Sequence, residues 1–408
     1  MNRRGFLAAG TAALASPAWT QSPDDAFQAF VAAAEQRASA AGVSAATLAQ
    51  AREGLAYNPN LVRPAGADPE SRRVGRYVQA LLSGDGQRAR AKRAANPRMA
   101  EIEVRYGVPA SVLTAFWGRE SSYGADFGRL DVFSTLASMG VAGRGSTDWT
   151  GEYVCALRIV ERGDRSRDQL RGSGAGALGH TQLMPSSFLT YGDDFDADGK
   201  VDVWNASPLD ALASAARHIQ DAPVAGPPLP AEGRAWQRGR GWIVPVTLPP
   251  GFDLAQVEVE ETALTSTQWS ALGVRADEPW SDLDREQPAK LALPAGIGGP
   301  ALLLLPNYDV FERYNPSRTY ALGVGLLARL IEGRPSVAWP DEAPLSLSER
   351  QSAQQGLQRM GLYPGPIDGD LGSGSRRAIR RWQRDHGLTA DGYLTTQVVQ
   401  ALTPTSPA

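Results

Sequence analysis

The chain has 408 residues, of which 42% are hydrophobic and 21% are charged, so it is long enough for two or three domains with ordinary cores. This composition excludes a disordered chain and a collagen-like fibre. The formal net charge of −3 offers no basic field to a polyanion, so we expect no nucleic-acid partner.

Residues 1–18 have the pattern of an export signal. Arg3 and Arg4 precede a short apolar run, and the small residues Ser16 and Ala18 suit a cleavage site. The paired arginines resemble a twin-arginine signal, with an ordinary secretory leader as the alternative. No cysteine follows the leader to carry a lipid anchor, and no later run reaches the roughly 20 apolar residues that span a bilayer. We expect a soluble periplasmic protein without a transmembrane segment.

Helical periodicity dominates the chain. It predicts helices from Pro23 to about Glu103, from Pro109 to about Asp221, and from Ser317 to Gly333. Between about 223 and 306, prolines, glycines and short extended segments predict a strand-rich insertion. The segments expected to be extended are WIVPVTL at 242–248, QVEVEET at 256–262 and PALLLLP at 300–306. A linker at 336–344 then leads to a separate segment at 345–403.

Glu120 lies in the stretch FWGRESSYG at 116–124, on the same helical face as Phe116 and beside Trp117. Burying a carboxylate beside aromatic rings disfavours its charged form and raises its pKa, which suits a general acid. The alternative is a structural glutamate paired with Arg119 or Arg129. The spacing alone leaves both interpretations open.

Two further stretches carry neutral hydrogen-bonding groups of the kind that bind sugar hydroxyls and acetamides. The small-residue stretch GSGAGALGHTQLMPSSF at 172–188 contains Ser173, His180, Thr181 and Gln182. The stretch LPNYDVFERYNPSRTYA at 305–321 contains Asn307, Tyr308, Tyr314, Asn315 and Tyr320. A tight structural loop and a packed loop before a helix capped by Ser317 are the structural alternatives.

The segment DDFDADGKVDVWN matches the opening of a calcium loop. The oxygen ligands would come from Asp194, Asp196 and Asp198, from the carbonyl of Lys200 and from Asp202, with Gly199 at the turn. The twelfth position is Asn205, where such a loop expects a bidentate glutamate. An aspartate-rich turn before a helix is the alternative.

Taken in order, the stretches GVPASVLTAFWGRESSYG, GAGALGHTQLMPSSFLTYGDDFDADGKVDVWN and LPNYDVFERYNPSRTYALGV resemble the lytic murein transglycosylases of the membrane-bound lytic transglycosylase B type. The C-terminal pieces LQRMGLYPGPIDGDLG, SRRAIRRWQRDHGL and ADGYL resemble the peptidoglycan-binding domain 1 family. The implied fold is mainly α: a lysozyme-like catalytic region at 23–335 with the strand-rich insertion, and a small three-helix module at 345–403.

The resemblance implies cleavage of peptidoglycan between N-acetylmuramic acid and N-acetylglucosamine to give 1,6-anhydromuramyl products. It makes Glu120 the only acid and base, and it assigns Ser173, Gln182, Tyr314, Asn315 and Tyr320 to the substrate cleft. It implies no catalytic cofactor, a structural calcium completed by Asp210, and glycan strands as the partner, with association into cell-wall enzyme complexes left open.

Two other functions stay open at this point. A hydrolytic muramidase needs a second carboxylate, which Asp126 or Asp131 could supply. An inactive scaffold that only binds the wall is the non-enzymatic alternative. Within the C-terminal module, Asp368, Gly369, Arg376 and Asp391 are expected wall contacts, and Ile379, Trp382 and Leu388 are expected core residues.

Overall fold

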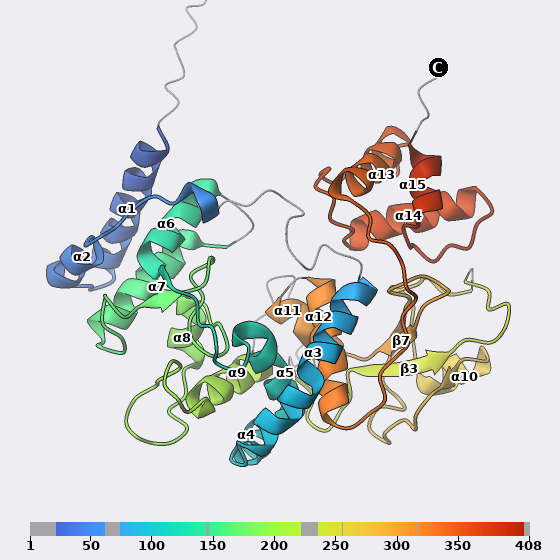
Figure 1. Cartoon of the computed structure of the whole chain (residues 1–408), viewed down its shortest axis with the longest axis horizontal. Coiled ribbons are helices and arrows are strands. Elements are labelled where there is room, and N and C mark those ends of the chain that lie inside the picture. The colour runs from blue at the N-terminus through green and yellow to red at the C-terminus, as the bar shows by residue number, and fades with distance from the viewer. Residues whose placement is uncertain are drawn as a thin grey trace, which may run out of the picture.

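Figure 1 shows the computed structural model of the chain. The structure describes residues 22–61, 74–143, 147–221, 236–254, 256–315 and 317–403. The expected leader at 1–18 lies outside the described residues. Within them, no helix combines the length and the apolar character needed to cross a membrane.

The first unit, called here the N-terminal lobe, is built from helices α1 (Pro23–Ala40), α2 (Ala45–Ala51), α6 (Val132–Ala142), α7 (Trp149–Glu161) and α8 (Pro185–Tyr191). It also contains the 3-10 helix η1 (Pro59–Leu61) and the antiparallel pair β1 (Leu130–Asp131) and β2 (Arg171–Gly172). Helix α7 packs against α1, α6 and α8. Their shared core includes Phe27, Phe133 and Tyr153.

The second unit, the central bundle, consists of α3 (Val74–Ala94), α4 (Met99–Tyr106), α5 (Ala110–Ser121), α9 (Leu209–Asp221), α11 (Tyr308–Tyr314) and α12 (Arg318–Ile331). Helix α12 packs against α3, α5 and α11, and nearly all of its residues are buried. This burial places α12 inside the core of the bundle. The chain leaves the bundle at the end of α5, passes through the lobe and returns with α9, so the end of α5 lies where the two units join (Figure 1).

The third unit, the insertion (residues 236–306), carries β3 (Ile243–Thr247), β4 (Ala263–Leu264), α10 (Ser266–Ala271), β5 (Arg275–Ala276), β6 (Ala289–Ala292) and β7 (Ala301–Leu304). Its five strands form one sheet in the order β4-β6-β7-β3-β5, and every neighbouring pair is antiparallel. The predicted strand-rich insertion is confirmed, and β3 and β7 fall inside two of the predicted extended segments.

The third predicted extended segment, QVEVEET, is wrong. Residues 256–262 form turns, and Glu260 has a left-handed φ of 71°. The side chain of Thr262 closes the turn by accepting a hydrogen bond from the Glu258 N–H at 2.8 Å. The alternation of valine and glutamate predicts a strand, but this local side-chain hydrogen bond stabilises a turn instead.

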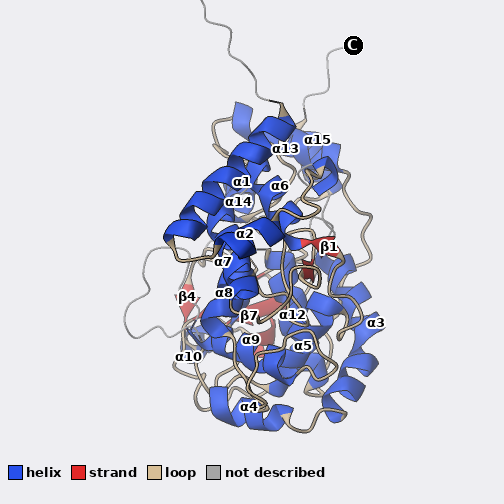
Figure 2. Cartoon of the chain, turned by 90° about the vertical axis from the view of Figure 1, so that its left-hand side faces the viewer, coloured by secondary structure: helices blue, strands red, loops and turns tan. Residues whose placement is uncertain are grey.

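The fourth unit, the C-terminal module, has three helices as expected: α13 (Leu347–Arg359), α14 (Ser373–Asp385) and α15 (Thr396–Leu402). Ile379 and Trp382 lie in its core, whereas Leu388 is 49% exposed, so its expected core position is wrong. In Figure 1 the module lies above the sheet of the insertion, across the molecule from the N-terminal lobe. Figure 2 shows how strongly helices dominate the chain, which confirms the mainly α fold class.

Candidate active site

Glu120 lies in the last turn of α5, where its Oε1 accepts a hydrogen bond from the hydroxyl of Tyr320. Tyr320 is the third residue of α12, and the side chain of Ser317, the predicted cap, accepts a hydrogen bond from its N–H at 3.3 Å. Burial and the charge of Glu120 raise the pKa of Tyr320 well above its usual value. The phenol therefore stays protonated at every working pH and remains a donor to the carboxylate.

Aromatic rings surround this pair, as the apolar helical face predicted. The ring centroid of Phe116 lies 4.5 Å from that of Tyr314 and 6.2 Å from that of Tyr320. The Tyr314 hydroxyl donates to the carbonyl of Thr181 at 2.7 Å. Burial first, and the charge of Glu120 second, raise the pKa of Tyr314. Tyr314 thus connects α11 to the 172–188 loop next to the carboxylate.

Arg119 is a neighbour of the carboxylate in sequence, and its guanidinium faces aromatic groups. Its Nε donates to the Tyr77 hydroxyl at 2.6 Å, and its guanidinium carbon lies 5.5 Å from the ring centroid of Tyr320. Tyr77 and Arg119 also line a groove of about 1470 Å³ between α3 and the linker. No sequence pattern indicated Tyr77, because it lies 42 residues before Arg119 on a helix without a motif.

The backbone after Glu120 is in an unusual conformation. Ser122 and Tyr123 both have left-handed φ angles, 51° and 62°, which cost free energy for residues with side chains and are found at functional sites. Gly124 follows with φ +81°, and a Cβ there would lie 2.4 Å from Cε1 of His180. The tight turn therefore depends on glycine to let the chain pass His180.

His180 supports this turn from inside. It is 4% exposed, its Nδ1 accepts from the indole N–H of Trp117 at 2.9 Å, and its Nε2 donates to the carbonyl of Asn205 at 2.8 Å. Burial lowers its pKa, so the ring is neutral. The expectation that His180 and Thr181 present groups to a sugar is wrong, since both are buried and bonded inside the fold.

Ser173 and Gln182 lie in the loop that faces the segment following Glu120. The Gln182 amide donates to the carbonyls of Phe127 at 3.3 Å and Gly179 at 2.9 Å. The Ser173 hydroxyl oxygen accepts from the N–H groups of Ala175 and Ala177, at 3.4 and 3.2 Å. This leaves the hydroxyl proton of Ser173 and the carbonyl oxygen of the Gln182 side chain as the groups that each could offer a ligand.

Asn315 ends α11, and its side-chain oxygen accepts from the N–H of Ser317 at 2.9 Å. Its amide NH₂ is the group that it could offer a ligand. Only two residues separate Asn315 from Arg318, the first residue of α12, so one short segment brings Tyr314 and Asn315 to the end of the helix that carries Tyr320.

The two candidates for a second carboxylate have structural roles. Asp131 caps α6 by accepting from the Ser134 N–H at 2.8 Å, and it pairs with Arg167 and, at 3.0 Å, with Arg171. Asp126 is exposed and accepts from the N–H of Gly128 at 2.9 Å in its own turn. Both carboxylates thus have bonds of their own within the fold.

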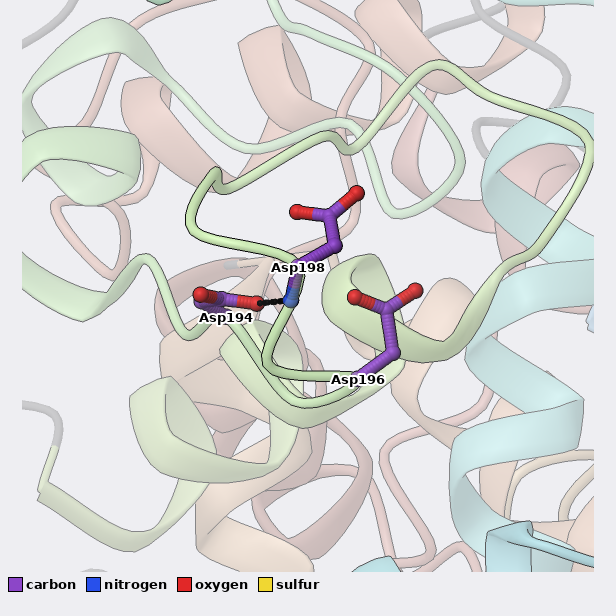
Figure 3. Close-up of side chains that lie close together, drawn as sticks. All are labelled: Asp194, Asp196 and Asp198. Carbon is purple, nitrogen blue, oxygen red and sulfur yellow. Dashed lines mark hydrogen bonds between the residues drawn. The ribbon is translucent and has the colours of Figure 1, made fainter.

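The aspartate-rich loop brings three carboxylates together, as Figure 3 shows. Oxygen atoms of Asp194, Asp196 and Asp198 lie within 4.8 Å of one another. Gly199 has φ +93°, the left-handed geometry that the sixth position of a calcium loop requires. Asp194 also accepts from the N–H groups of Asp198 and Gly199, at 3.1 and 2.9 Å, which curls the loop around its first carboxylate.

Two side-chain oxygens of this loop, Oδ1 of Asp196 and Oδ1 of Asn205, are buried and are left without a hydrogen-bond partner among the described residues. Such a buried acceptor fits a cation, so the residues present suit calcium. Asp210 lies behind the loop: its Oδ1 accepts from the Phe195 N–H and its Oδ2 from the Asp202 N–H, each at 3.0 Å. Asp202 itself accepts from the N–H of Trp204 at 2.9 Å.

Comparison with known families decides the relationship. The profile of the transglycosylase SLT domain family matches residues 26–329, about three quarters of the chain. The chain belongs to this family. A putative peptidoglycan binding domain matches residues 346–402, which form the C-terminal module.

The relatives of the chain include proteins of two bacteria. The chain is 28% identical over 232 residues to membrane-bound lytic murein transglycosylase B of Escherichia coli (strain K12), a match that spans 55% of the chain and 58% of that protein. It is 34% identical to SltB3 of Pseudomonas aeruginosa, solved in complex with NAG-anhNAM-pentapeptide, with a TM-score of 0.80 over 92% of the chain and 99% of that structure.

A third relative shares the fold. Escherichia coli Slt35, solved in complex with calcium, has a TM-score of 0.60 at 24% identity, and the match covers 75% of the chain and 92% of that structure.

Proposed function

We propose that this chain is a lytic transglycosylase that cleaves the β-1,4 bond between N-acetylmuramic acid and N-acetylglucosamine in peptidoglycan. The observation that carries the proposal is the half-buried carboxylate of Glu120, hydrogen-bonded by Tyr320 within an aromatic pocket of a chain from the transglycosylase SLT family. The SltB3 complex supports the product class, because its ligand contains an anhydromuramyl sugar.

In the first step, protonated Glu120 gives its proton to the glycosidic oxygen, and the bond from that oxygen to C1 of the muramyl sugar breaks. In the second step, the carboxylate takes the proton of the muramyl C6 hydroxyl while that oxygen bonds to C1. The proton that left Glu120 is thereby replaced, and the product is a 1,6-anhydromuramyl end. An attacking group on the substrate itself needs no activated water.

The cleft residues supply neutral contacts around this carboxylate. Tyr320 donates to Glu120, and Tyr314 packs on Phe116 beside it. We assign Ser173, Gln182 and Asn315 to hydroxyl and acetamide groups of the glycan, because each has a polar group that is not consumed by its own structural bond. Tyr314 donates its hydroxyl proton to the Thr181 carbonyl, so we assign it to the cleft through its ring and the acceptor side of its oxygen.

The hydrolytic alternative needs two carboxylates that face each other across the scissile bond, about 5 to 9.5 Å apart. Asp131 is bonded to a helix N-terminus and two arginines, and Asp126 is exposed in its own turn. These bonds support the interpretation that Glu120 works alone.

We also propose the division of the chain into a leader at 1–18, a catalytic region at 23–335, a linker at 336–344 and a wall-binding module at 345–403. Cell-wall glycan lies outside the cytoplasm, so the substrate requires export to the periplasm, which the leader pattern supports. The module supports retention on the wall through its match to a peptidoglycan binding domain.

Calcium would stabilise the aspartate-rich loop if it were held by Asp194, Asp196, Asp198, Asp202 and the Lys200 carbonyl. This loop ends at Asn205, whose carbonyl accepts a hydrogen bond from His180. Asp210 would fix the loop from behind through backbone N–H groups. We expect calcium to raise the melting temperature of the wild type and not that of Asp196→Asn. An equal rise in both proteins, or none in the wild type, would contradict this site.

The function is tested with purified sacculi and mass spectrometry of the released muropeptides. The wild type should release anhydromuramyl products, and Glu120→Gln should lose at least about a hundredfold in rate, the contribution of a general acid. Unchanged binding to sacculi and an unchanged melting temperature would show that the variant is folded. Reducing-end products would establish a hydrolase, near-normal rates in the variant would refute the assignment of Glu120, and no product from either would favour a scaffold.

A further inference from the structure

Glu260, in the turn that the sequence pattern missed, lies between three arginines from two other units. Its Oε1 is 2.9 Å from Nη2 of Arg318, and its Oε2 is 3.0 Å from Nε of Arg376 and 3.9 Å from Nη1 of Arg380. Arg318 is the first residue of α12, whereas Arg376 and Arg380 belong to α14 of the C-terminal module. One carboxylate therefore joins the insertion, the central bundle and the module.

The cluster is buried. The Glu260 side chain is 10% exposed and that of Arg380 is 2% exposed. Burial alone would raise the pKa of Glu260, but the charges of Arg318, Arg376 and Arg380 together hold it below its usual value. Burial lowers the pKa of Arg376, and the charge of Arg318 lowers it further. The arginines of the two units thus repel each other. Glu260, which contacts arginines of both units, offsets that repulsion, and the half-exposed Glu261 adds a weaker contact to Arg380 at 3.8 Å.

The cluster also lies at the start of the helix that serves the catalytic carboxylate. Arg318 is followed two residues later by Tyr320, which donates to Glu120. A cation in the first turn of a helix opposes the helix dipole, and the carboxylate of Glu260 compensates for it. The position of this turn therefore depends on an anion that the insertion supplies and that the docked module keeps away from water.

A second contact shows that the module is seated on the insertion. Oδ2 of Asp391 accepts from the N–H of Ile297 at 3.1 Å. Gly296 has φ +70°, and a Cβ on it would lie 2.8 Å from Oδ2 of Asp391 and 3.1 Å from Cβ of Tyr393. Arg376 and Asp391, which the sequence suggested as wall contacts, both face the body of the protein here.

We propose that Glu260 is a positioning residue that docks the C-terminal module on the catalytic region and holds the first turn of α12 so that Tyr320 meets Glu120. The proposal rests on the proposed function for its catalytic half. It makes the module a support of the active site as well as a wall anchor, and it gives the insertion a role in the reaction.

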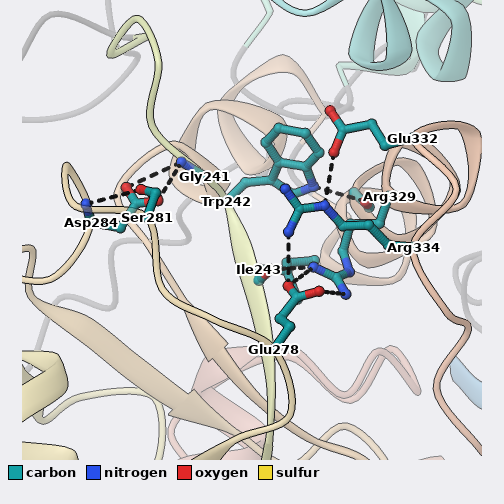
Figure 4. A network of polar contacts seen from close by, with 10 residues as sticks. Gly241, Trp242, Ile243, Glu278, Ser281, Asp284, Arg329, Glu332 and Arg334 are labelled. Atoms are coloured by element: carbon teal, nitrogen blue, oxygen red, sulfur yellow. Dashed lines mark hydrogen bonds and ion pairs between the residues drawn. The ribbon is translucent and has the colours of Figure 1, made fainter.

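The structure offers a matched control at the other end of α12, shown in Figure 4. Glu278 of the insertion accepts from Arg329 at 2.5 and 3.1 Å and from Arg334 at 3.0 Å. Arg329 and Arg334 lie near the end of α12 farthest from Tyr320, and Glu278 pairs with neither of the module's arginines named above. Glu278→Gln therefore removes a comparable ion cluster between the insertion and α12 without releasing the module.

The experiment compares the wild type, Glu260→Gln and Glu278→Gln as full chains. Small-angle X-ray scattering and limited proteolysis of the linker at 336–344 report docking, and kcat, KM and the pH profile of anhydromuramyl release report positioning. We expect Glu260→Gln to increase the radius of gyration, to be cut in the linker at least about tenfold faster, and to lose at least about tenfold in kcat with little change in KM. Glu278→Gln should keep wild-type docking and stay within about threefold in kcat.

Two further variants keep the test decisive. Should Glu260→Gln fail to fold, Arg376→Gln removes the module's half of the cluster and should also expose the linker, with a smaller fall in kcat because the pair of Glu260 and Arg318 remains. Arg376→Gln added to Glu260→Gln should restore part of the docking, since it removes one uncompensated charge.

Each outcome decides a part of the proposal. Wild-type scattering and proteolysis in both Glu260→Gln and Arg376→Gln would overturn the docking role. An exposed linker with unchanged kcat and pH profile would overturn the positioning role. If the wild type itself released no anhydromuramyl product, the proposed function and the positioning role would fall together, whereas scattering and proteolysis would still decide the docking.

Discussion

Replacing Tyr320 by phenylalanine tests the hydrogen bond to Glu120 on which the proposed mechanism depends. The ring is 1% exposed and packs near Phe116, so phenylalanine keeps the buried apolar contact and removes only the hydroxyl. A hydrogen bond to a charged group contributes about 1.5–3 kcal/mol. If that stabilisation is used when the carboxylate forms, kcat should fall by roughly 10- to 150-fold, because each 1.36 kcal/mol is a factor of ten.

The assay is the initial rate of anhydromuramyl release from sacculi across pH 4 to 9. Loss of the donor favours the protonated form of Glu120, so the alkaline limb of the profile should move to higher pH in the variant. Tyr153→Phe is the matched control, since Tyr153 is fully buried in the N-terminal lobe and its hydroxyl has no hydrogen-bond partner among the described residues. Equal rates and profiles for Tyr320→Phe and the wild type would refute the reasoning.

Asp126→Asn should stay within about threefold of the wild-type rate with the same anhydromuramyl product, and a reducing-end product lost in this variant would revive the hydrolase. Asp131→Asn should lower stability by about 1–3 kcal/mol in urea titrations, through its lost ion pairs, without changing the product. Burial lowers the pKa of His218 to about 4, against roughly 6.5 when unfolded. Between these pH values the unfolded chain binds a proton that the folded chain does not, so the folding stability falls by at most about 3 to 4 kcal/mol as the pH falls from 6.5 to 4. Urea titrations at pH 7 and 4.5 should show that His218→Phe loses less folding stability on acidification than the wild type does. Equal losses of stability in the two proteins would contradict the role of His218.

The sequence predicted those structural features of the candidate site that belong to local motifs. Glu120 on an aromatic helical face, the Ser317 cap and the helices of the C-terminal module all follow from spacing over a few residues. These features are local, so the pattern that indicates them is contained in one stretch of sequence. The strands β3 and β7 were predicted for the same reason.

The errors concern residues whose role depends on distant partners. His180 is a residue type that can bind sugar hydroxyls, yet both of its ring nitrogens form hydrogen bonds inside the fold, one with Trp117 and one with Asn205. The valines around Glu260 alternate as in a strand, but Glu260 lies in a turn. There its carboxylate forms ion pairs with Arg318 and Arg376, which lie 58 and 116 residues further along the chain. No local period reports such contacts, because they exist only after the units have docked.

In the proposed mechanism, the place of Glu120 lets one carboxylate serve as acid and then as base. In the last turn of α5 it lies at the negative end of the helix dipole, which disfavours its charged form by about 0.3–1 kcal/mol and helps it to keep a proton. The hydrogen bond from Tyr320 acts in the opposite direction and is larger, about 1.5–3 kcal/mol, but it reaches full strength only when the carboxylate is charged. The Tyr320 hydroxyl therefore stabilises the transition state, in which the proton has left Glu120, and it stabilises the resting protonated acid less. Because Tyr320 sits at the start of α12, whatever moves that turn changes the balance between the two steps.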